Sequence, residues 1–91
     1  MRYRFRATRT FWRSFHDLPV EQQRNARAAF GTLRANPFDA RLRSHKIHRL
    51  SARYRRTIYP AVIEGDLRAV FYIEAATVVT VDVGSHSIYR G

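Results

Sequence analysis

The sequence contains no cysteine, only three prolines and four glycines, and seven acidic residues. Without cysteine the chain can form neither disulfides nor thiolate–zinc sites, so packing and hydrogen bonds must hold its fold. The glycines are too few and too scattered for a Gly-rich phosphate loop or a dinucleotide-binding fingerprint. Every stretch without a charged residue, for example 75–81, is far shorter than the roughly 18 apolar residues that a membrane span needs.

The shortage of acidic residues leaves a strongly basic chain. Lys and Arg number 17 against seven Asp and Glu, which gives a formal net charge of +10, and Lys46 is the single lysine. A genomic bias in composition explains this preference for arginine. Phosphate binding explains it as well, because planar guanidinium groups grip phosphates with two hydrogen bonds and stack on bases. In either case we expect a polyanionic partner, which is RNA, DNA or an acidic protein.

The length and composition indicate a single small domain. Hydrophobic residues make up 45% of the 91 positions, enough to bury one modest core, and we expect one domain spanning 1–91. The first six residues alternate basic and aromatic side chains and lack the continuous apolar stretch of a secretory signal. We therefore expect a soluble, cytoplasmic protein with no membrane segment.

The first half of the chain has one strand pattern followed by two helix patterns. In this strand pattern the less polar side chains are Tyr3, Phe5 and Ala7. They alternate with Arg4, Arg6 and Thr8, as is typical of a half-buried strand. Thr8 or Thr10 can cap a short helix after it. Pro19 suits the first turn of a second helix, which we expect to run to about Ala35 and to end at Asn36–Pro37.

The second half is dominated by strand patterns. Residues 38–52 are irregular and rich in Arg and His, and we expect a surface loop there. Alternation then predicts strands at 54–63, 67–74 and 77–83, with Pro60 marking an edge position or a bulge. The order β-α-α-β-β-β predicts an α+β fold in which a helical hairpin packs on one face of a small antiparallel sheet.

The side chains that could carry chemistry are His, Arg and Tyr. The scattered acids give a metal site little support, and we expect no metal and no cofactor. A nuclease that uses the RNA 2′-OH as nucleophile needs an acid, a base and cations near the phosphate. The candidate acid and base are His45 and His86, the candidate phosphate ligands are Arg55 and Arg68, and Tyr89 is a stacking or proton-relay group.

Each of these residues also has a purely structural interpretation. His86 follows a predicted strand, where its ring can bond a turn carbonyl, and His45 can be an ordinary surface side chain. Arg68 can be one more solvated charge on a strand. Tyr54, Tyr59 and Tyr72 are expected in the core or on the sheet surface. Composition and spacing alone therefore indicate a basic α+β domain that binds nucleic acid.

Four short motifs in a fixed order carry a resemblance to a known family. They are Asn-Pro-Phe at 36–38, Leu-Arg-Ser-His-Lys-Ile at 42–47, Gly-Asp-Leu-Arg-Ala-Val-Phe-Tyr at 65–72 and Val-Gly-Ser-His-Ser-Ile-Tyr at 83–89. With the predicted element order, the chain resembles the RelE/ParE superfamily of bacterial toxin–antitoxin toxins. The second and fourth motifs are most similar to the YafQ- and HigB-like toxins, which cut messenger RNA on the ribosome.

The resemblance implies a role for individual residues. Arg68 corresponds to the arginine that contacts the scissile phosphate in RelE-like nucleases, and the basic residue of the preceding strand corresponds to Arg55, with Arg56 as the alternative. The implied catalytic residues are His45, Arg68, His86 and Tyr89. The implied substrate-binding residues are Arg43, Lys46, Arg55 and Arg56.

The resemblance also implies a function and partners. The expected protein is the toxin of a type II toxin–antitoxin system, a ribosome-dependent endoribonuclease that leaves a 2′,3′-cyclic phosphate without metal or cofactor. Its expected partners are the ribosome, mRNA and a cognate antitoxin, and operator DNA is contacted only through that antitoxin. Two alternatives remain: a ParE-like inhibitor of DNA gyrase, and an inactive homologue that only binds antitoxin or nucleic acid.

Overall fold

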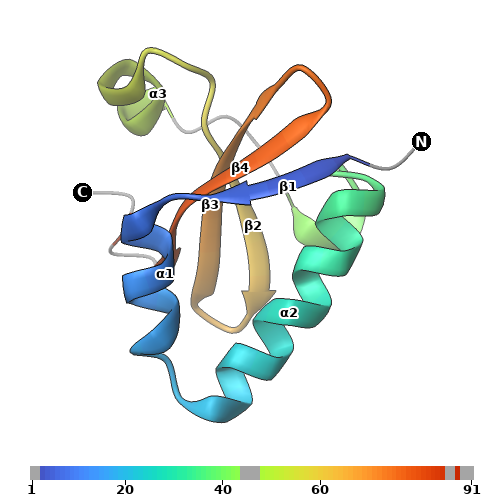
Figure 1. Ribbon diagram of the computed structural model, residues 1–91, viewed down its shortest axis with the longest axis vertical. Helices are drawn as coiled ribbons and strands as arrows, with labels where there is room; N and C mark the ends of the chain where they lie inside the picture. The colour runs from blue at the N-terminus through green and yellow to red at the C-terminus, as the bar shows by residue number, and fades with distance from the viewer. Residues whose placement is uncertain (1–2, 44–47, 86–87, 89–91) are drawn as a thin grey trace.

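The structure is a computed structural model of the 91-residue chain and describes residues 3–43, 48–85 and 88. The described residues form four strands, three α-helices and a short 3-10 helix, and the sheet and the two N-terminal helices make two layers (Figure 1). In chain order the elements are β1 (Arg4–Ala7), α1 (Arg9–His16), α2 (Val20–Ala35), the 3-10 helix η1 (Ala40–Leu42), α3 (His48–Tyr54), β2 (Tyr59–Glu64), β3 (Leu67–Glu74) and β4 (Thr77–Gly84).

The four strands form one sheet in the order β1-β4-β3-β2. The hairpins β2–β3 and β3–β4 are antiparallel, but β1 runs parallel to β4, with Arg4 opposite Thr77 and Ala7 opposite Thr80. The α+β class and the order β-α-α-β-β-β are thus confirmed, whereas the expectation of a wholly antiparallel sheet is wrong for β1. A tight turn dictates antiparallel pairing, and β1 is joined to its neighbour by no such turn.

The two N-terminal helices cover one face of the sheet and diverge from each other as a V (Figure 1). Thr8 caps α1, as predicted: its hydroxyl accepts from the Phe11 N–H at 3.1 Å and donates to the Val81 carbonyl at 2.9 Å. The helix α2 starts directly after Pro19 and ends before Asn36, also as predicted. One hydroxyl therefore ties the start of α1 to the middle of the sheet.

The core lies between these helices and the sheet. Two buried clusters fill it, and each joins helix residues to strand residues. Phe11 and Phe15 of α1 are fully buried, and Trp12 packs against both, with ring centroids 5.1 Å and 5.6 Å away. The strand residues of the two clusters are Ala61, Leu67, Ala69, Phe71, Val78 and Val83.

The segment between α2 and β2 differs from the sequence prediction. The expected loop at 38–52 contains η1 and most of α3, and the strand expected from Tyr54 begins only at Tyr59. Arg55 has a left-handed φ of 55°, which stops α3, and the buried Ser51 hydroxyl then accepts a hydrogen bond from the Ile58 N–H at 2.8 Å. The helix spans seven residues, about two turns, so a periodicity search has too few positions to detect an apolar stripe.

The prediction for Pro60 is confirmed, because β2 is an edge strand in which Pro60 pairs with Val70 of β3. Edge strands accept proline since one of their backbone edges needs no ladder partner. A register shift between Val62 and Glu64 adds an irregularity to the same strand.

Candidate nucleic-acid interface

The side chains of β3 alternate between the two faces of the sheet. Leu67 and Ala69 pack against α1, so Arg68, Val70 and Tyr72 project from the opposite face, which we call the far face. Its apolar floor is a third buried cluster around Val70, with Tyr72 at its margin. The other members of this cluster and its margin are Ile58, Val81 and Ile88. The far face thus combines a firm apolar base with an arginine and a tyrosine.

Arg68 is half-buried and held by neutral acceptors. Its guanidinium donates to the Gly65 carbonyl at 2.6 Å and to the Leu67 carbonyl at 3.3 Å, which bends the side chain over the β2–β3 turn. Gly65 has a φ of 44° in that turn. No carboxylate among the described residues forms an ion pair with Arg68. The turn therefore orients the guanidinium, and no carboxylate in the described part of the chain neutralises it.

Gly84 lies opposite Arg68 in the β3–β4 register, and its lack of a side chain has a structural reason. A Cβ atom at this position would lie 2.9 Å from the Ile88 Cγ2 atom, closer than carbon atoms pack. Ile88 donates its N–H to the Ser85 carbonyl at 3.0 Å and joins the margin of the far-face cluster. Gly84 therefore permits Ile88 to pack at the end of β4.

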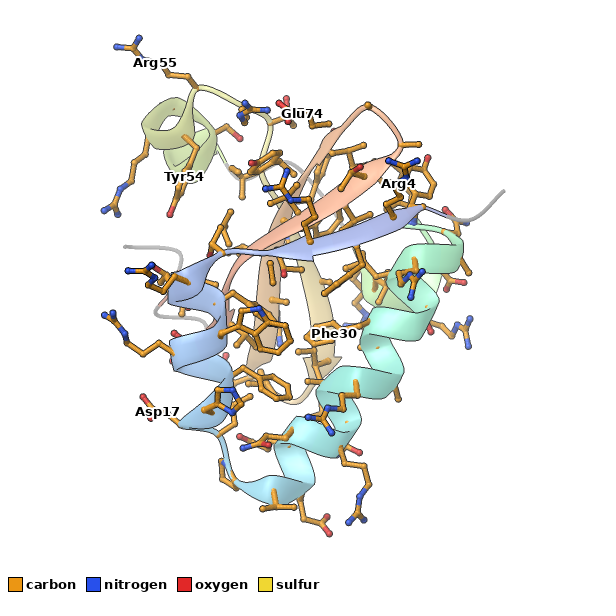
Figure 2. The ribbon with its side chains drawn as sticks, in the orientation of Figure 1. Arg4, Asp17, Phe30, Tyr54, Arg55 and Glu74 are labelled. Carbon is orange, nitrogen blue, oxygen red and sulfur yellow. The ribbon has the colours of Figure 1, made fainter. Side chains whose placement is uncertain are left out.

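The end of α3 supplies a second group of cations. Arg53 lies over the Tyr54 ring, 5.9 Å from its centroid, and Arg56 lies over the Tyr72 ring at 4.5 Å. Arg56 also donates to the Glu74 carboxylate. That hydrogen bond is the main reason why the pKa of the Arg56 guanidinium is raised above its usual value. Arg55 is exposed and points away from the rest of the chain (Figure 2).

These contacts separate the two arginines that the sequence could not distinguish. Arg56 lies against the sheet through Tyr72 and Glu74, whereas Arg55 projects into solvent beyond α3. Tyr72 follows Arg68 by four residues on the same face, a separation of about 13 Å along the strand. The structure therefore places Arg56 and Arg68 toward opposite ends of β3 on the far face and does not bring them into contact.

The remaining predicted site residues divide into one that is described and four that are not. Arg43 is exposed, follows η1 and has a left-handed φ of 52°. The neighbouring Asp39 accepts two hydrogen bonds from the Arg41 side chain, both at 3.0 Å, and the first cause that lowers its pKa to about 2 is this side-chain bonding. The predictions for His45, Lys46, His86 and Tyr89 lie outside the described residues.

Sequence reasoning missed Glu74 as a partner of Arg56 and left Tyr72 without a role. Both residues share the face of Arg68, since positions 68, 70, 72 and 74 alternate with the core positions of β3. The alternation along β3 therefore predicts that Tyr72 and Glu74 share a face with Arg68. It does not predict their contact with Arg56, because that contact depends on the fold of the segment after α3.

Two clefts lie away from the far face. Their volumes are about 300 Å³ and 320 Å³, one lies between α2 and β2 and the other beside the β2–β3 turn, and neither is lined by Arg68 or Tyr72. Within the described ranges, no group of three or more His, Asp or Glu side chains could hold a metal ion. Across the same ranges, no helix is long and apolar enough to cross a membrane.

Comparisons with known proteins give structural matches only. No protein-family model matches the chain. No curated protein matches it either. The structure is similar to a chain of the toxin–antitoxin complex RelBE2 from Mycobacterium tuberculosis, with a TM-score of 0.74 and 26% sequence identity, over 94% of this chain and 100% of that one.

Two further structures share the fold at lower identity. A chain of the DinJ–YafQ toxin–antitoxin complex from E. coli matches with a TM-score of 0.66 and 15% identity, over 100% of both chains. A chain of the archaeal RelE–RelB complex from Pyrococcus horikoshii matches with a TM-score of 0.64 and 14% identity, over 93% of this chain and 96% of that one. The match to each of these structures therefore extends over nearly the whole domain.

Proposed function

Because the chain belongs to the RelE/ParE superfamily of toxins, we propose that it is the toxin of a type II toxin–antitoxin system and cleaves mRNA on the ribosome. The observation that carries the nuclease proposal is the state of Arg68. Its guanidinium is held by two carbonyl oxygens, forms no ion pair with a described carboxylate, and lies on the same face of β3 as Tyr72. A preorganised, unneutralised cation is suited to stabilise the negative charge that develops on a phosphate.

The proposed reaction is an intramolecular transesterification of RNA. The 2′-oxygen attacks the adjacent phosphorus, the bond from phosphorus to the 5′-oxygen breaks, and a 2′,3′-cyclic phosphate remains on the upstream fragment. A base takes the proton of the 2′-OH and an acid protonates the leaving 5′-oxygen, and we assign these two roles to His45 and His86. Arg68 offsets the phosphate charge, and Tyr89 stacks on a base or relays a proton.

The basic segments on either side of α3 are proposed to bind the substrate. Arg43 and Arg55 are exposed, and Lys46 belongs to the same segment of the chain. Arg56 belongs to this group through its position over Tyr72. Arginine and aromatic side chains together form a common platform for single-stranded nucleic acid, because bases stack on the rings while the cations follow the backbone.

The proposed protein partner is a cognate antitoxin. The similar structures named above come from toxin–antitoxin complexes, which supports a partner of this kind. An acidic antitoxin segment that folds on binding would neutralise part of the +10 charge and cover the far face. In this proposal operator DNA is bound through the antitoxin.

Primer extension on mRNA bound to translating ribosomes tests the nuclease proposal. The protein is added to ribosomes that translate a defined message, with Arg68→Ala, His86→Ala and the exposed α1 control Arg13→Ala in parallel. We expect new 5′ ends at A-site codons with the unmodified protein and a rate lowered by about 10²–10³-fold in Arg68→Ala, as for loss of a transition-state donor. Arg13→Ala removes the same charge from α1 and should cleave at close to the original rate.

Two results would contradict the proposal. Equal cleavage by Arg68→Ala and Arg13→Ala would remove Arg68 from the reaction. An absence of new 5′ ends, while expression of the protein still arrests growth, would shift the assignment to the gyrase inhibitor, which requires no acid–base pair.

A further inference from the structure

The ion pair between Arg56 and Glu74 differs from the other two among the described residues. The pairs Arg24–Glu21 and Arg41–Asp39 each join residues within three positions of one another on one element or turn. Arg56 and Glu74 are 18 residues apart, so their contact joins the segment after α3 to the end of β3. The position of this pair is therefore a property of the fold and not of a local sequence pattern.

The Arg56–Glu74 ion pair lies at the surface, where another anion can replace the carboxylate. The side chains of Arg56 and Glu74 are 44% and 53% exposed. Exposed ion pairs contribute little to stability because water and dissolved ions solvate both partners. Another anion can therefore take the place of the Glu74 carboxylate at low cost.

Tyr72 keeps the guanidinium in place independently of Glu74. The Arg56 guanidinium carbon lies 4.5 Å from the centroid of the Tyr72 ring, within the range of a cation–π contact. A guanidinium that lies over a ring still presents its N–H groups at its edge. Carboxylates and phosphates both offer these groups a pair of oxygen atoms. The Glu74 carboxylate thus occupies a position that suits a phosphate.

We propose that Glu74 is a built-in competitor for Arg56 that a phosphate of single-stranded RNA must displace before Arg56 can bind it. Nucleic acid is favoured over an acidic peptide because the exposed Tyr54 lies next to Arg53 and can stack on a base, and because the planar Arg56 guanidinium over Tyr72 offers a second stacking surface. The inference rests on the proposed function for the identity of the ligand. It requires RNA binding and does not require cleavage.

If Glu74 competes for Arg56, RNA must first be bound by other residues before it can contact Arg56. With Glu74 in place, Arg56 is masked from weakly bound RNA, and only RNA fixed by other contacts gains the additional phosphate contact. Removal of the carboxylate should strengthen binding to any single strand. It should also increase the number of phosphates that the protein neutralises by one.

The test measures the binding of a fully 2′-O-methylated, fluorescent RNA oligonucleotide by anisotropy over a range of salt concentrations. This RNA lacks the 2′-OH nucleophile, so the protein can bind it without cutting it. The variants are Glu74→Gln, Arg56→Ala, the double variant and the control Glu21→Gln. The control removes the same charge and frees Arg24 from the other exposed pair, on α2.

We expect Glu74→Gln to steepen the dependence of log K on log salt concentration by about 0.7, the value for one added phosphate contact on a single strand. The affinity gain should vanish when Arg56→Ala is combined with it, and Glu21→Gln should leave the slope unchanged. In the unmodified protein, the NMR signal of the Arg56 side-chain N–H should stay unchanged at the salt concentrations of the binding assay and should shift only at lower salt, where phosphate contacts are stronger and one displaces Glu74. This second readout does not depend on how any variant folds.

The outcomes separate this inference from the nuclease proposal. If Glu74→Gln binds no better than Glu21→Gln, or if neither binds the oligonucleotide, the inference is overturned. If the gain depends on Arg56 while the unmodified protein cuts no mRNA on ribosomes, the masked phosphate site stands and the nuclease proposal fails.

Discussion

Asp39 is the side chain that caps η1, directly before Arg43. Its carboxylate caps η1 by accepting the Arg41 N–H at 2.9 Å and also binds the Arg41 side chain. Arg41 is therefore engaged with Asp39, and the pKa of its guanidinium is raised, chiefly by this hydrogen bond. Arg43 follows directly, at the left-handed position that ends η1. The cap thus sets the backbone from which the candidate substrate-binding residue emerges.

The pKa of Asp39 predicts a pH dependence at the same place. The folded value, about 2, lies below the value near 3.9 of an unfolded chain, so between these two values the unfolded state binds more protons. The contribution of the cap is therefore fully present above about pH 4 and is lost as the pH falls toward 2. We expect an NMR titration of the Asp39 carboxyl carbon to have its midpoint near pH 2.

Asp39→Asn is the control for this titration. The amide oxygen can still accept the Arg41 N–H, but the side chain no longer titrates, so the shift of the Arg41 amide between pH 4 and 2 should disappear. A midpoint near the unfolded value in the unmodified protein would show that Asp39 and Arg41 are not paired in solution.

At the residue scale the sequence predicted faces better than contacts. Alternation placed Arg68 opposite Leu67 and Ala69, and the structure confirms this placement. The choice between Arg55 and Arg56 could not be made, since it depends on the left-handed φ of Arg55 and on Tyr72. Ordinary propensities give little warning of such a backbone angle at an arginine.

At the scale of elements, α3 is the feature that periodicity could not find. The helix spans only seven residues, and its sequence includes two arginines and a histidine. It is tied to β2 by Ser51, whose buried hydroxyl accepts from the Ile58 N–H. Ile58 is itself fully buried within the far-face cluster. The hydrogen bond from Ile58 to Ser51 and the buried Ile58 side chain therefore anchor α3 to the sheet.

Ser51→Ala tests this anchor. The substitution leaves the buried Ile58 N–H without its acceptor, which costs about 1–3 kcal/mol. We expect the free energy of unfolding from urea denaturation to fall by this amount and the Ile58 amide to exchange its hydrogen faster. The exposed neighbour Ala52→Ser is the control and should change neither quantity. Unchanged exchange at Ile58 in Ser51→Ala would contradict the role of this hydrogen bond.

The orientation of β1 is a second feature of this scale that the sequence did not predict. The two hairpins were predictable because short turns at 64–66 and 75–76 separate strand patterns, and tight turns enforce antiparallel pairing. Gly65 and Ala75 adopt left-handed φ values in these turns. Every other element of the described chain lies between β1 and its neighbour β4 in the sequence, so no local turn constrains the direction of β1. Only long-range packing, with Thr8 bonded to the Val81 carbonyl, decides that it runs parallel.

At the scale of the whole molecule, the order of elements was predictable from the hydrophobic periodicity, and the family resemblance was predictable from four motifs that occur in order between residues 36 and 89. The net charge of +10 predicted a polyanionic partner, and the far face offers Arg68, Arg56 and Tyr72 for one. The predictions for His45, His86 and Tyr89 fall outside the described residues and stay predictions. These predictions rest on the motifs alone. The catalytic role of Arg68 also stays a prediction, but it rests both on a motif and on the position of its guanidinium over the β2–β3 turn.

The proposed reaction cuts mRNA through the 2′-OH of the message. The most direct measurement uses a defined ribosomal complex with a single 2′-O-methyl group at the nucleotide where the unmodified message is cut. The account predicts cleavage of the unmodified message, a 2′,3′-cyclic phosphate on its upstream fragment by mass spectrometry, and no cleavage at the methylated nucleotide. Cleavage that continues at the methylated nucleotide, or an upstream fragment that ends in a 3′-hydroxyl, would contradict it.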